Sequence, residues 1–210
     1  MPDTVFRVVL PLCWLWLIVG VGANRWQVLS QLGRDPIVIR PWRKAVTAGD
    51  YLERALSICA LLLTADIVLN AMSPGVVADT LAIKALRTSR AVGSLGLMLL
   101  AVGSLLAALA VRQMGVSWRI GIDGQAPGPL VSRGLFSRVR HPIYGGMLLA
   151  TAGIAGVTAD LLSVTVAAAA WVGIPVQARF EEAFLLSRYP QDYPRYLEQT
   201  GRFWPRIPGG

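Results

Sequence analysis

The sequence predicts an all-α, polytopic membrane protein with about five transmembrane helices. Apolar residues make up 54% of its 210 residues and gather in five long runs. Each run has about 17–25 residues, the length that crosses a bilayer as an α-helix, and soluble cores do not carry five such runs. The runs are Val8–Asn24, Ala55–Met72, Ala91–Val111, Pro142–Ala159 and Leu161–Ala178.

The first run is expected to remain in the protein as a helix rather than to be a cleaved signal. Arg7 is the only basic residue before it, and residues 22–25 make a poor small-residue cleavage site. A basic loop follows from Arg25 to Asp50, in which Pro36 and Pro41 argue against a long helix.

Lysine and arginine divide unequally between the two faces of such a membrane protein. With five spans threaded alternately, 4 of the 20 basic residues fall on the N-terminal face and 16 on the other. The positive-inside rule therefore predicts an N-terminus outside and a C-terminus in the cytoplasm. The four on the N-terminal face are Arg7, Lys84, Arg87 and Arg90.

The net charge of +8 would suggest a nucleic-acid partner in a soluble protein. Here the charge is explained by topology, and no nucleic-acid-reading motif is present, so no nucleic-acid partner is expected. A metal site is not expected either, because the chain has one histidine and its two cysteines, Cys13 and Cys59, fall inside apolar runs. We interpret both cysteines as small packing residues.

Asp66 is the ionisable residue within the apolar runs, in the outer half of the second. An intramembrane charge is a functional candidate by default. It lies far from the cytoplasmic motif described below, which favours a hydrogen-bonded structural residue near the outer interface. The loop Ser73–Arg90 begins with Pro74 and has room for a short interfacial helix, and the small residues of the third run are typical of close helix packing.

The fourth and fifth runs are separated by Asp160 alone, which predicts a tight antiparallel hairpin. His141 lies nineteen residues before Asp160 and Arg179 lies nineteen after it. At about 1.5 Å per residue in both helices, His141 and Tyr144 come level with Val176–Glu182. The small residues expected to allow close approach of the two helices are Gly146, Ala150 and Gly153 on one and the alanines 167–170 on the other.

The segment that opens the fourth run carries His141, the single histidine of the chain. A lone histidine more often has no chemical role, but its neighbours here favour one. Pro142 suits the first turn of a helix, where its missing N–H costs nothing. Gly145 and Gly146 thin that helix, so that another group can lie against its backbone.

The fifth helix is expected to continue past the membrane to about Tyr189, which gives its carboxylates Glu181 and Glu182 a cytoplasmic position. Pro190 ends it. The tail beyond, with Tyr193–Tyr196 and Arg202–Pro205, is aromatic and basic. It is expected to fold back over the same place or to lie on the headgroups.

Residues 130–145 resemble the hallmark of the isoprenylcysteine carboxyl methyltransferase and phospholipid methyltransferase superfamily: a leucine-valine, a glycine and an aromatic, then Arg-His-Pro-x-Tyr-x-Gly. Gly146 supplies the glycine after the spacer. Residues 117–121 also look like bacterial members, and the resemblance covers roughly residues 90–206. The residues that fit the family's second pattern, Glu-Glu-x-x-Leu…Tyr-x-x-Tyr…Arg-x-x-Pro, are Glu181, Glu182, Leu185, Tyr193, Tyr196, Arg202 and Pro205.

This resemblance implies an integral-membrane methyltransferase that uses S-adenosyl-L-methionine in a pocket facing the cytoplasm. Transfer from a sulfonium donor needs no metal and no protein nucleophile, and depends on holding donor and acceptor in line. Carboxylates and aromatic rings suit a cationic, aromatic ligand. By position, the residues implied to bind the cofactor are Pro129, Leu130, Val131, Phe136, His141, Pro142, Tyr144, Glu181 and Glu182.

The substrate side departs from the family. Where eukaryotic carboxyl methyltransferases carry an arginine for the substrate carboxylate, this chain has Gln177, with Arg179 as the nearest substitute. Tyr189-Pro190 replaces the usual Phe-Gly. We therefore expect a lipophilic acceptor, isoprenoid-like or another lipid, that enters from the bilayer, with a carboxylate among the candidate acceptor groups. Gln177 and Arg179 are the candidate substrate contacts.

The expected organisation is residues 1–90 as N-terminal transmembrane helices and loops, and residues 91–210 as the methyltransferase core. The expected location is the bacterial inner (plasma) membrane. Two alternatives stay open: a membrane reductase with a nicotinamide cofactor, although no phosphate-cradling glycine loop is seen, and a non-enzymatic small transporter or assembly protein.

Overall fold

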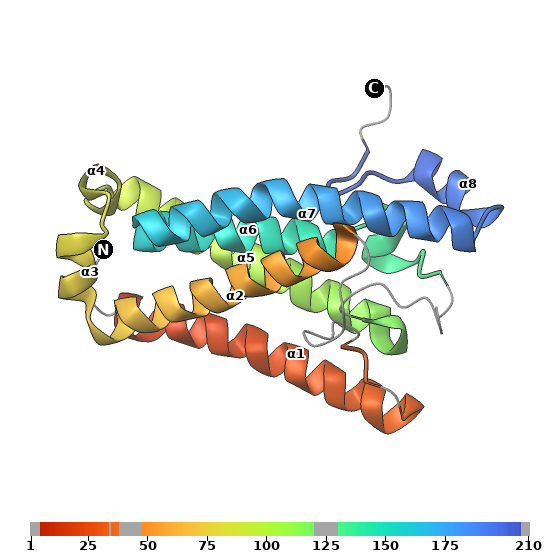
Figure 1. The fold of residues 1–210 in the computed structure, drawn as a ribbon, viewed down its shortest axis with the longest axis horizontal. Coiled ribbons are helices and arrows are strands. Elements are labelled where there is room, and N and C mark those ends of the chain that lie inside the picture. The colour runs from red at the N-terminus through yellow and green to blue at the C-terminus, as the bar shows by residue number, and fades with distance from the viewer. Residues whose placement is uncertain (1–4, 34, 38–47, 120–129, 207–210) are drawn as a thin grey trace.

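The computed structural model describes residues 5–33, 35–37, 48–119 and 130–206. Over these residues the chain is helical, with two isolated β-bridges and no strand. Figure 1 shows the long helices running along the length of the molecule, with α3 and α4 at one end and α8 at the other. The elements are η1 (Val5–Val9), α1 (Leu10–Leu32), α2 (Ala48–Met72), α3 (Pro74–Thr80), α4 (Lys84–Arg87), α5 (Arg90–Met114), η2 (Gly115–Ser117), η3 (Gly134–Ser137), α6 (Pro142–Thr158), α7 (Leu161–Arg188) and α8 (Asp192–Gln199).

Each of the five apolar runs forms one long helix, so the predicted polytopic all-α membrane fold is confirmed. Within the described ranges, four helices are long and apolar enough to cross a membrane, namely α1, α2, α7 and α5 with its continuation η2. The fifth, α6, has 17 residues and therefore spans about 26 Å, a little less than the ~30 Å hydrocarbon core. The protein is thus an integral membrane protein.

Helices α1 and α2 differ from the sequence prediction because each extends well beyond its apolar run. Helix α1 continues to Leu32 instead of ending at Asn24, and stops at Gly33, whose φ of 64° is left-handed and whose N–H bonds the Leu29 carbonyl at 2.9 Å. Helix α2 begins at Ala48, ahead of the apolar run that starts at Ala55. The polar residues before that run are therefore part of the helix. Pro41 of the connecting loop lies outside the described residues.

Helices α5 and α6 touch backbone to backbone. A Cβ added at Gly146 would lie 2.6 Å from the Gly103 carbonyl, and one added at Gly153 would lie 2.7 Å from the Gly96 carbonyl. The prediction that Gly146, Ala150 and Gly153 face the alanines of the fifth helix is therefore wrong, because they face α5. Where both facing helices carry glycines, their backbones can come closer than where one of them carries alanines. This favours contact of the α6 glycines with those of α5 over contact with the alanines of α7.

The predicted hairpin between α6 and α7 is confirmed. Its turn uses Ala159, with a left-handed φ of 47°, and Asp160, whose side chain caps α7 by accepting a 2.9 Å bond from the Ser163 N–H. The preceding loop holds the turn in place, because the Ile83 N–H bonds the Ala159 carbonyl at 2.8 Å. That loop contains α3 and α4, where the sequence left room for one short helix.

Asp66 belongs to a buried polar cluster at the hairpin turn. Figure 1 shows that α6 and α7 meet at the end of the molecule that carries α3 and α4. The Asp66 side chain is fully buried, and Oδ1 accepts a 3.3 Å bond from the Asn70 amide, which also lies 3.1 Å from Asp160 Oδ2. Arg87 donates to Asn70 Oδ1 at 3.4 Å and to the Thr158 carbonyl at 2.9 Å. The prediction of a hydrogen-bonded Asp66 is confirmed, and the cluster ties α2 to the hairpin.

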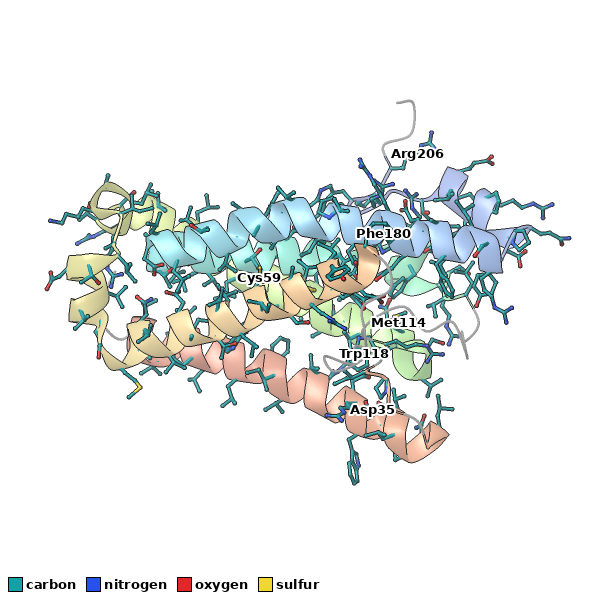
Figure 2. The ribbon with its side chains drawn as sticks, in the orientation of Figure 1. Asp35, Cys59, Met114, Trp118, Phe180 and Arg206 are labelled. Atoms are coloured by element: carbon teal, nitrogen blue, oxygen red, sulfur yellow. The ribbon has the colours of Figure 1, made fainter. Side chains whose placement is uncertain are left out.

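The apolar core lies among α1, α2, α5, α6 and α7. Leu10, Ile67, Leu100 and Ile154 are among its buried members. Cys13 and Cys59 are free thiols that pack against this cluster, as the sequence suggested. Figure 2 shows Cys59 near the middle of the long axis, among the side chains of α2.

Candidate functional site

The backbone that leads into α6 is paired with the C-terminal tail. The Gly201 N–H bonds the Arg138 carbonyl at 3.1 Å, the Arg140 N–H bonds the Gly201 carbonyl at 2.9 Å, and the His141 N–H bonds the Arg202 carbonyl at 2.9 Å. These three bonds hold residues 138–141 beside the tail, so the predicted folding-back of the tail over the motif is confirmed.

Gly145 is the point where the tail crosses α6. A Cβ added there would lie 2.9 Å from the carbonyl oxygen of Phe203, whereas one added at neighbouring Gly146 would strike α5 instead. The expectation that these glycines let another group lie against the helix backbone is confirmed, and the two groups are the tail on one side and α5 on the other.

His141, Tyr144 and Glu181 meet across the α6–α7 hairpin. The Tyr144 hydroxyl donates a hydrogen bond to Glu181 Oε1, and His141 Nδ1 lies 3.6 Å from Glu181 Oε2. The imidazole stacks on the Tyr144 ring, with centroids 5.5 Å apart and an interplanar angle of 14°. Phe203 of the tail covers it at 6.2 Å between centroids. The predicted hairpin register is therefore confirmed by contacts between side chains.

Glu182 lies at the centre of a buried charge network. Arg140 Nε donates to its Oε1 at 3.0 Å, and Arg202 donates to both oxygens, at 3.1 Å to Oε1 and 2.6 Å to Oε2. His141 Nε2 lies 3.4 Å from the same carboxylate but forms no hydrogen bond within the described residues. Most of the acceptor capacity of Glu182 is thus used by cations of the protein itself.

Helix α8 anchors the other side of this network. Arg140 donates through Nη1 to the Leu197 carbonyl at 3.2 Å and also to the Thr200 carbonyl. Tyr196 donates at 2.6 Å to the carbonyl of Phe136, a buried residue of η3. Burial raises the pKa of Tyr196 to about 12 and raises the pKa of Tyr193 still further, so both phenols are neutral at ordinary pH.

Gln177 joins the site to α2. Its side chain is buried, and its Nε2 donates to Oε1 of Glu53 at 3.0 Å. Gln177 shares a helix face with Glu181, four residues on. Arg179 lies between them and is exposed on another face of α7. The structure therefore places Gln177, but not Arg179, beside the carboxylate.

A groove of about 530 Å³ lies next to Pro142. It lies between α5, η3 and the tail. Of the residues predicted to bind the cofactor, Pro142 lines it. Gln113 shapes its floor by accepting a 2.7 Å bond from the Leu135 N–H. The lining residues are Leu106, Gln113, Gly134, Leu135, Ser137, Arg138, Val139, Pro142, Phe203, Trp204 and Pro205.

The remaining predicted residues fall outside this constellation. Pro129 lies outside the described residues, and Leu130 and Val131 are partly buried just after them. Phe136 is buried beneath α8. Figure 2 shows four labelled residues toward the end of the long axis that carries α8: Phe180 of α7, Met114 at the end of α5, Trp118 just after η2, and Arg206 of the tail.

Four residues of the site were not singled out by the sequence as binding residues: Arg140, Arg202, Phe203 and Glu53. Arg140 and Arg202 stand in the two recognised sequence patterns, and this was the signal that could have found them. Glu53 had no such signal, because it precedes the second apolar run by two residues and looks like an ordinary loop charge.

Part of this chain is similar to a known protein family. The phospholipid methyltransferase family matches residues 92–192, a segment that includes η3, α6 and α7. The cobalt-zinc-cadmium resistance protein CzcN of Cupriavidus metallidurans is 34% identical over 116 residues, which cover 55% of this chain and 48% of that protein. The chain thus spans about half the length of this curated relative.

A solved structure shares the fold. The eukaryotic intramembrane Ras methyltransferase ICMT (isoprenylcysteine carboxyl methyltransferase) matches with a TM-score of 0.55 and 17% identity, over 99% of this chain and 71% of that chain. At this identity the likeness concerns the fold alone. Together with the family match it confirms the resemblance that the two sequence patterns indicated.

Proposed function

We propose, from the match of residues 92–192 to the phospholipid methyltransferase family, that this protein is an S-adenosyl-L-methionine-dependent integral-membrane methyltransferase. Its acceptor would be a lipophilic molecule, isoprenoid-like or another lipid. The observation that carries the proposal is the meeting of His141, Tyr144 and Glu181 across the α6–α7 hairpin. With five spans threaded alternately, this cluster would lie on the face predicted to hold 16 of the 20 lysines and arginines.

The residues present fit a sulfonium cofactor. Glu181 keeps one quarter of its side chain exposed and offers a carboxylate to a cationic ligand. The His141, Tyr144 and Phe203 rings lie beside it, and aromatic faces also attract cations. When bound, S-adenosyl-L-methionine supplies a methyl group activated by positive sulfur, which needs neither a metal nor a protein nucleophile.

Glu181 would bind the cofactor, and Glu182 would position other residues of the site. Tyr144 orients Glu181 toward the ligand through its hydroxyl. Glu182 is held by Arg140 and Arg202, so it would act through the placement of His141 and of the tail rather than by touching the ligand. The further proposed cofactor contacts are Pro129, Leu130, Val131, Phe136 and Pro142.

The acceptor would enter from the bilayer, past the long apolar helices. Gln177 is the proposed substrate contact inside the site, and Arg179, exposed on α7, is the proposed contact nearer the surface. Residues 1–90 would act as an N-terminal part that completes the site through α2, and residues 91–210 as the methyltransferase core. The proposed location is the bacterial inner (plasma) membrane, with the N-terminus outside and the C-terminus in the cytoplasm.

A direct binding comparison tests this proposal against its two rivals. Purified protein in detergent is titrated with radiolabelled S-adenosyl-L-methionine and, in parallel, with NADPH. A methyltransferase binds the first and not the second, and S-adenosylhomocysteine competes for the site. Selective binding of NADPH would favour the membrane reductase, and binding of neither would favour a non-enzymatic transporter or assembly protein.

A further inference from the structure

The groove beside Pro142 combines apolar side chains with a polar end. Its volume of about 530 Å³ lies within the range of ~300–1,000 Å³ that is common for ligand sites. Leu106 and Trp204 are among its apolar lining residues. Gln113 and Arg138 are its longest polar side chains. Such a division suits a molecule that has a hydrocarbon part and a polar part.

The apolar end of the groove lies at the depth of the bilayer. Leu106 and Gln113 both line the groove and are seven residues apart on α5, which is about 10 Å along the helix. Leu106 belongs to the apolar run of this helix, and Gln113 is exposed just beyond it. Trp204 is 46% exposed, and exposed indole rings favour the headgroup level. The groove therefore extends from the headgroup region toward the hydrocarbon region, where a lipid can enter it.

The two longest polar side chains of the groove offer hydrogen-bond donors. Gln113 Oε1 accepts from the Leu135 N–H at 2.7 Å, so the amide NH₂ group is the part left for a ligand. The Arg138 guanidinium is a donor only. It is exposed, and within the described residues no carboxylate pairs with it. No aspartate or glutamate of the described ranges lines the groove, so these groups favour an anion.

Pro142 and Phe203 are the residues that the groove shares with the proposed cofactor site. His141, Tyr144 and Glu181 are not among the described residues that line it. The Phe203 ring covers the His141 imidazole, with 6.2 Å between the centroids. A molecule in the groove would therefore contact the same C-terminal tail that covers the site.

We propose that this groove binds an anionic phospholipid of the bilayer. Its phosphate accepts hydrogen bonds from Arg138 and Gln113, and one acyl chain lies along Leu106. A zwitterionic choline lipid binds more weakly, because its second charge is a cation and the groove holds an arginine and no carboxylate. The bound lipid is a resident component rather than the methyl acceptor, so this role goes beyond the proposed function and does not depend on it.

Competition binding to the full-length protein in mixed micelles tests the proposal. Tritiated dioleoylphosphatidylglycerol is bound to the tagged protein in a scintillation proximity assay. The unlabelled competitors are the same lipid and dioleoylphosphatidylcholine, which share both acyl chains and differ in net charge. We expect the phosphatidylglycerol to bind at least tenfold more tightly. Inorganic phosphate and S-adenosylhomocysteine, each added in excess, should not displace it.

Arg138→Gln tests the contact with the phosphate. The substitution keeps an amide donor and removes the charge, and an arginine near an anionic membrane surface contributes about fivefold to binding. Arg133→Gln is the matched control, because Arg133 is exposed in the same segment and does not line the groove. We expect phosphatidylglycerol affinity to fall at least fivefold in Arg138→Gln and to stay within twofold of wild type in Arg133→Gln.

Leu106→Trp tests the contact with the acyl chain. The larger ring would fill the deeper end of the groove, whereas Leu109→Trp places the same ring on an exposed position of α5 outside it. We expect weaker binding of both lipids in Leu106→Trp alone. Bound phosphatidylglycerol should also slow proteolysis of the tail, because Phe203 and Trp204 line the groove. Arg138→Gln should remove this protection.

Each other outcome counts against the proposal. No binding of phosphatidylglycerol, equal affinity for the two lipids, equal losses in Arg138→Gln and Arg133→Gln, or unchanged binding in Leu106→Trp would overturn it. Displacement by inorganic phosphate would make this a site for a free anion, and displacement by S-adenosylhomocysteine would assign the groove to the cofactor. Gel filtration checks that each variant is folded. If Leu106→Trp does not fold, the two arginine variants decide.

Discussion

The Tyr144 hydroxyl donates a hydrogen bond to the Glu181 carboxylate, from one arm of the α6–α7 hairpin to the other. The two residues are level because the turn at Ala159 and Asp160 is short and both helices rise equally per residue. The hydrogen bond fixes the orientation of the Glu181 carboxylate, which lies in the polar C-terminal part of α7. It is the structural basis of the first prediction.

Glu181→Gln should weaken the binding of S-adenosylhomocysteine. The substitution keeps the size of the side chain but removes its charge, and a hydrogen bond to a charged group contributes roughly 1.5–3 kcal/mol, which is about 10- to 150-fold in the dissociation constant. Tyr144→Phe and His141→Ala should act in the same direction. Calorimetry in detergent measures the affinities, with Glu198→Gln on the exposed face of α8 as control. Unchanged affinity in folded Glu181→Gln would remove this carboxylate from the site.

Glu182→Gln should destabilise the protein more than it changes ligand contacts. Arg140, whose side chain is 11% exposed, would lose its counterion, and removing one partner of a buried pair costs roughly 3–5 kcal/mol. We expect the lower end of this range, because the Arg202 side chain is 34% exposed. Thermal unfolding in detergent gives the change in stability. A midpoint equal to that of wild type would mean that the network does not hold the tail.

Gly145→Ala should detach the tail from α6. The added Cβ would lie 2.9 Å from the Phe203 carbonyl, which is backbone and cannot move aside without the tail. Limited proteolysis should then cut the C-terminal segment faster than in the wild type. Gly20→Ala is the matched control, because nothing lies within 4 Å of a Cβ added there. Equal cutting of the two variants would contradict the close crossing.

The docking of α8 should weaken in alkaline solution. Burial raises the pKa of Tyr196 to about 12, above its ordinary value near 10. The folded state therefore keeps a proton that the unfolded state loses, and stability is complete below pH ~10 and falls as the pH rises toward 12. The slope from this residue is at most about 1.4 kcal/mol per pH unit. Unfolding between pH 8 and 11 should show a shallower decline in Tyr196→Phe than in wild type, and identical slopes would refute the assignment.

The N-terminus should lie outside the cell and the C-terminus in the cytoplasm. The 4-to-16 division of basic residues motivates this orientation. In a background with Cys13→Ala and Cys59→Ala, the single substitution Asp79→Cys on α3 should react with an impermeant maleimide in intact cells. Glu198→Cys on α8 should react only after lysis. The reverse pattern would invert the topology.

The arrangement of the site was predictable where it depended on one connection along the chain. The one-residue link at Asp160 and the fixed helical rise were enough to bring His141 and Tyr144 level with Glu181. The partners of Glu182 were not predictable in this way. Arg140 and Arg202 meet it because the tail pairs with residues 138–141, which depends on contacts between distant parts of the chain.

By itself, the sequence determined the number of long helices and the hairpin, because the length of an apolar run and the thickness of a bilayer decide these without knowledge of neighbours. Only the tertiary structure decided which helix each face meets. Gly146 packs on α5 because two glycine-bearing helices come closest to each other, and Glu53 of α2 reaches Gln177 of α7. Such pairings are decided by side-chain packing between helices far apart in the chain, for which no local pattern of residues exists.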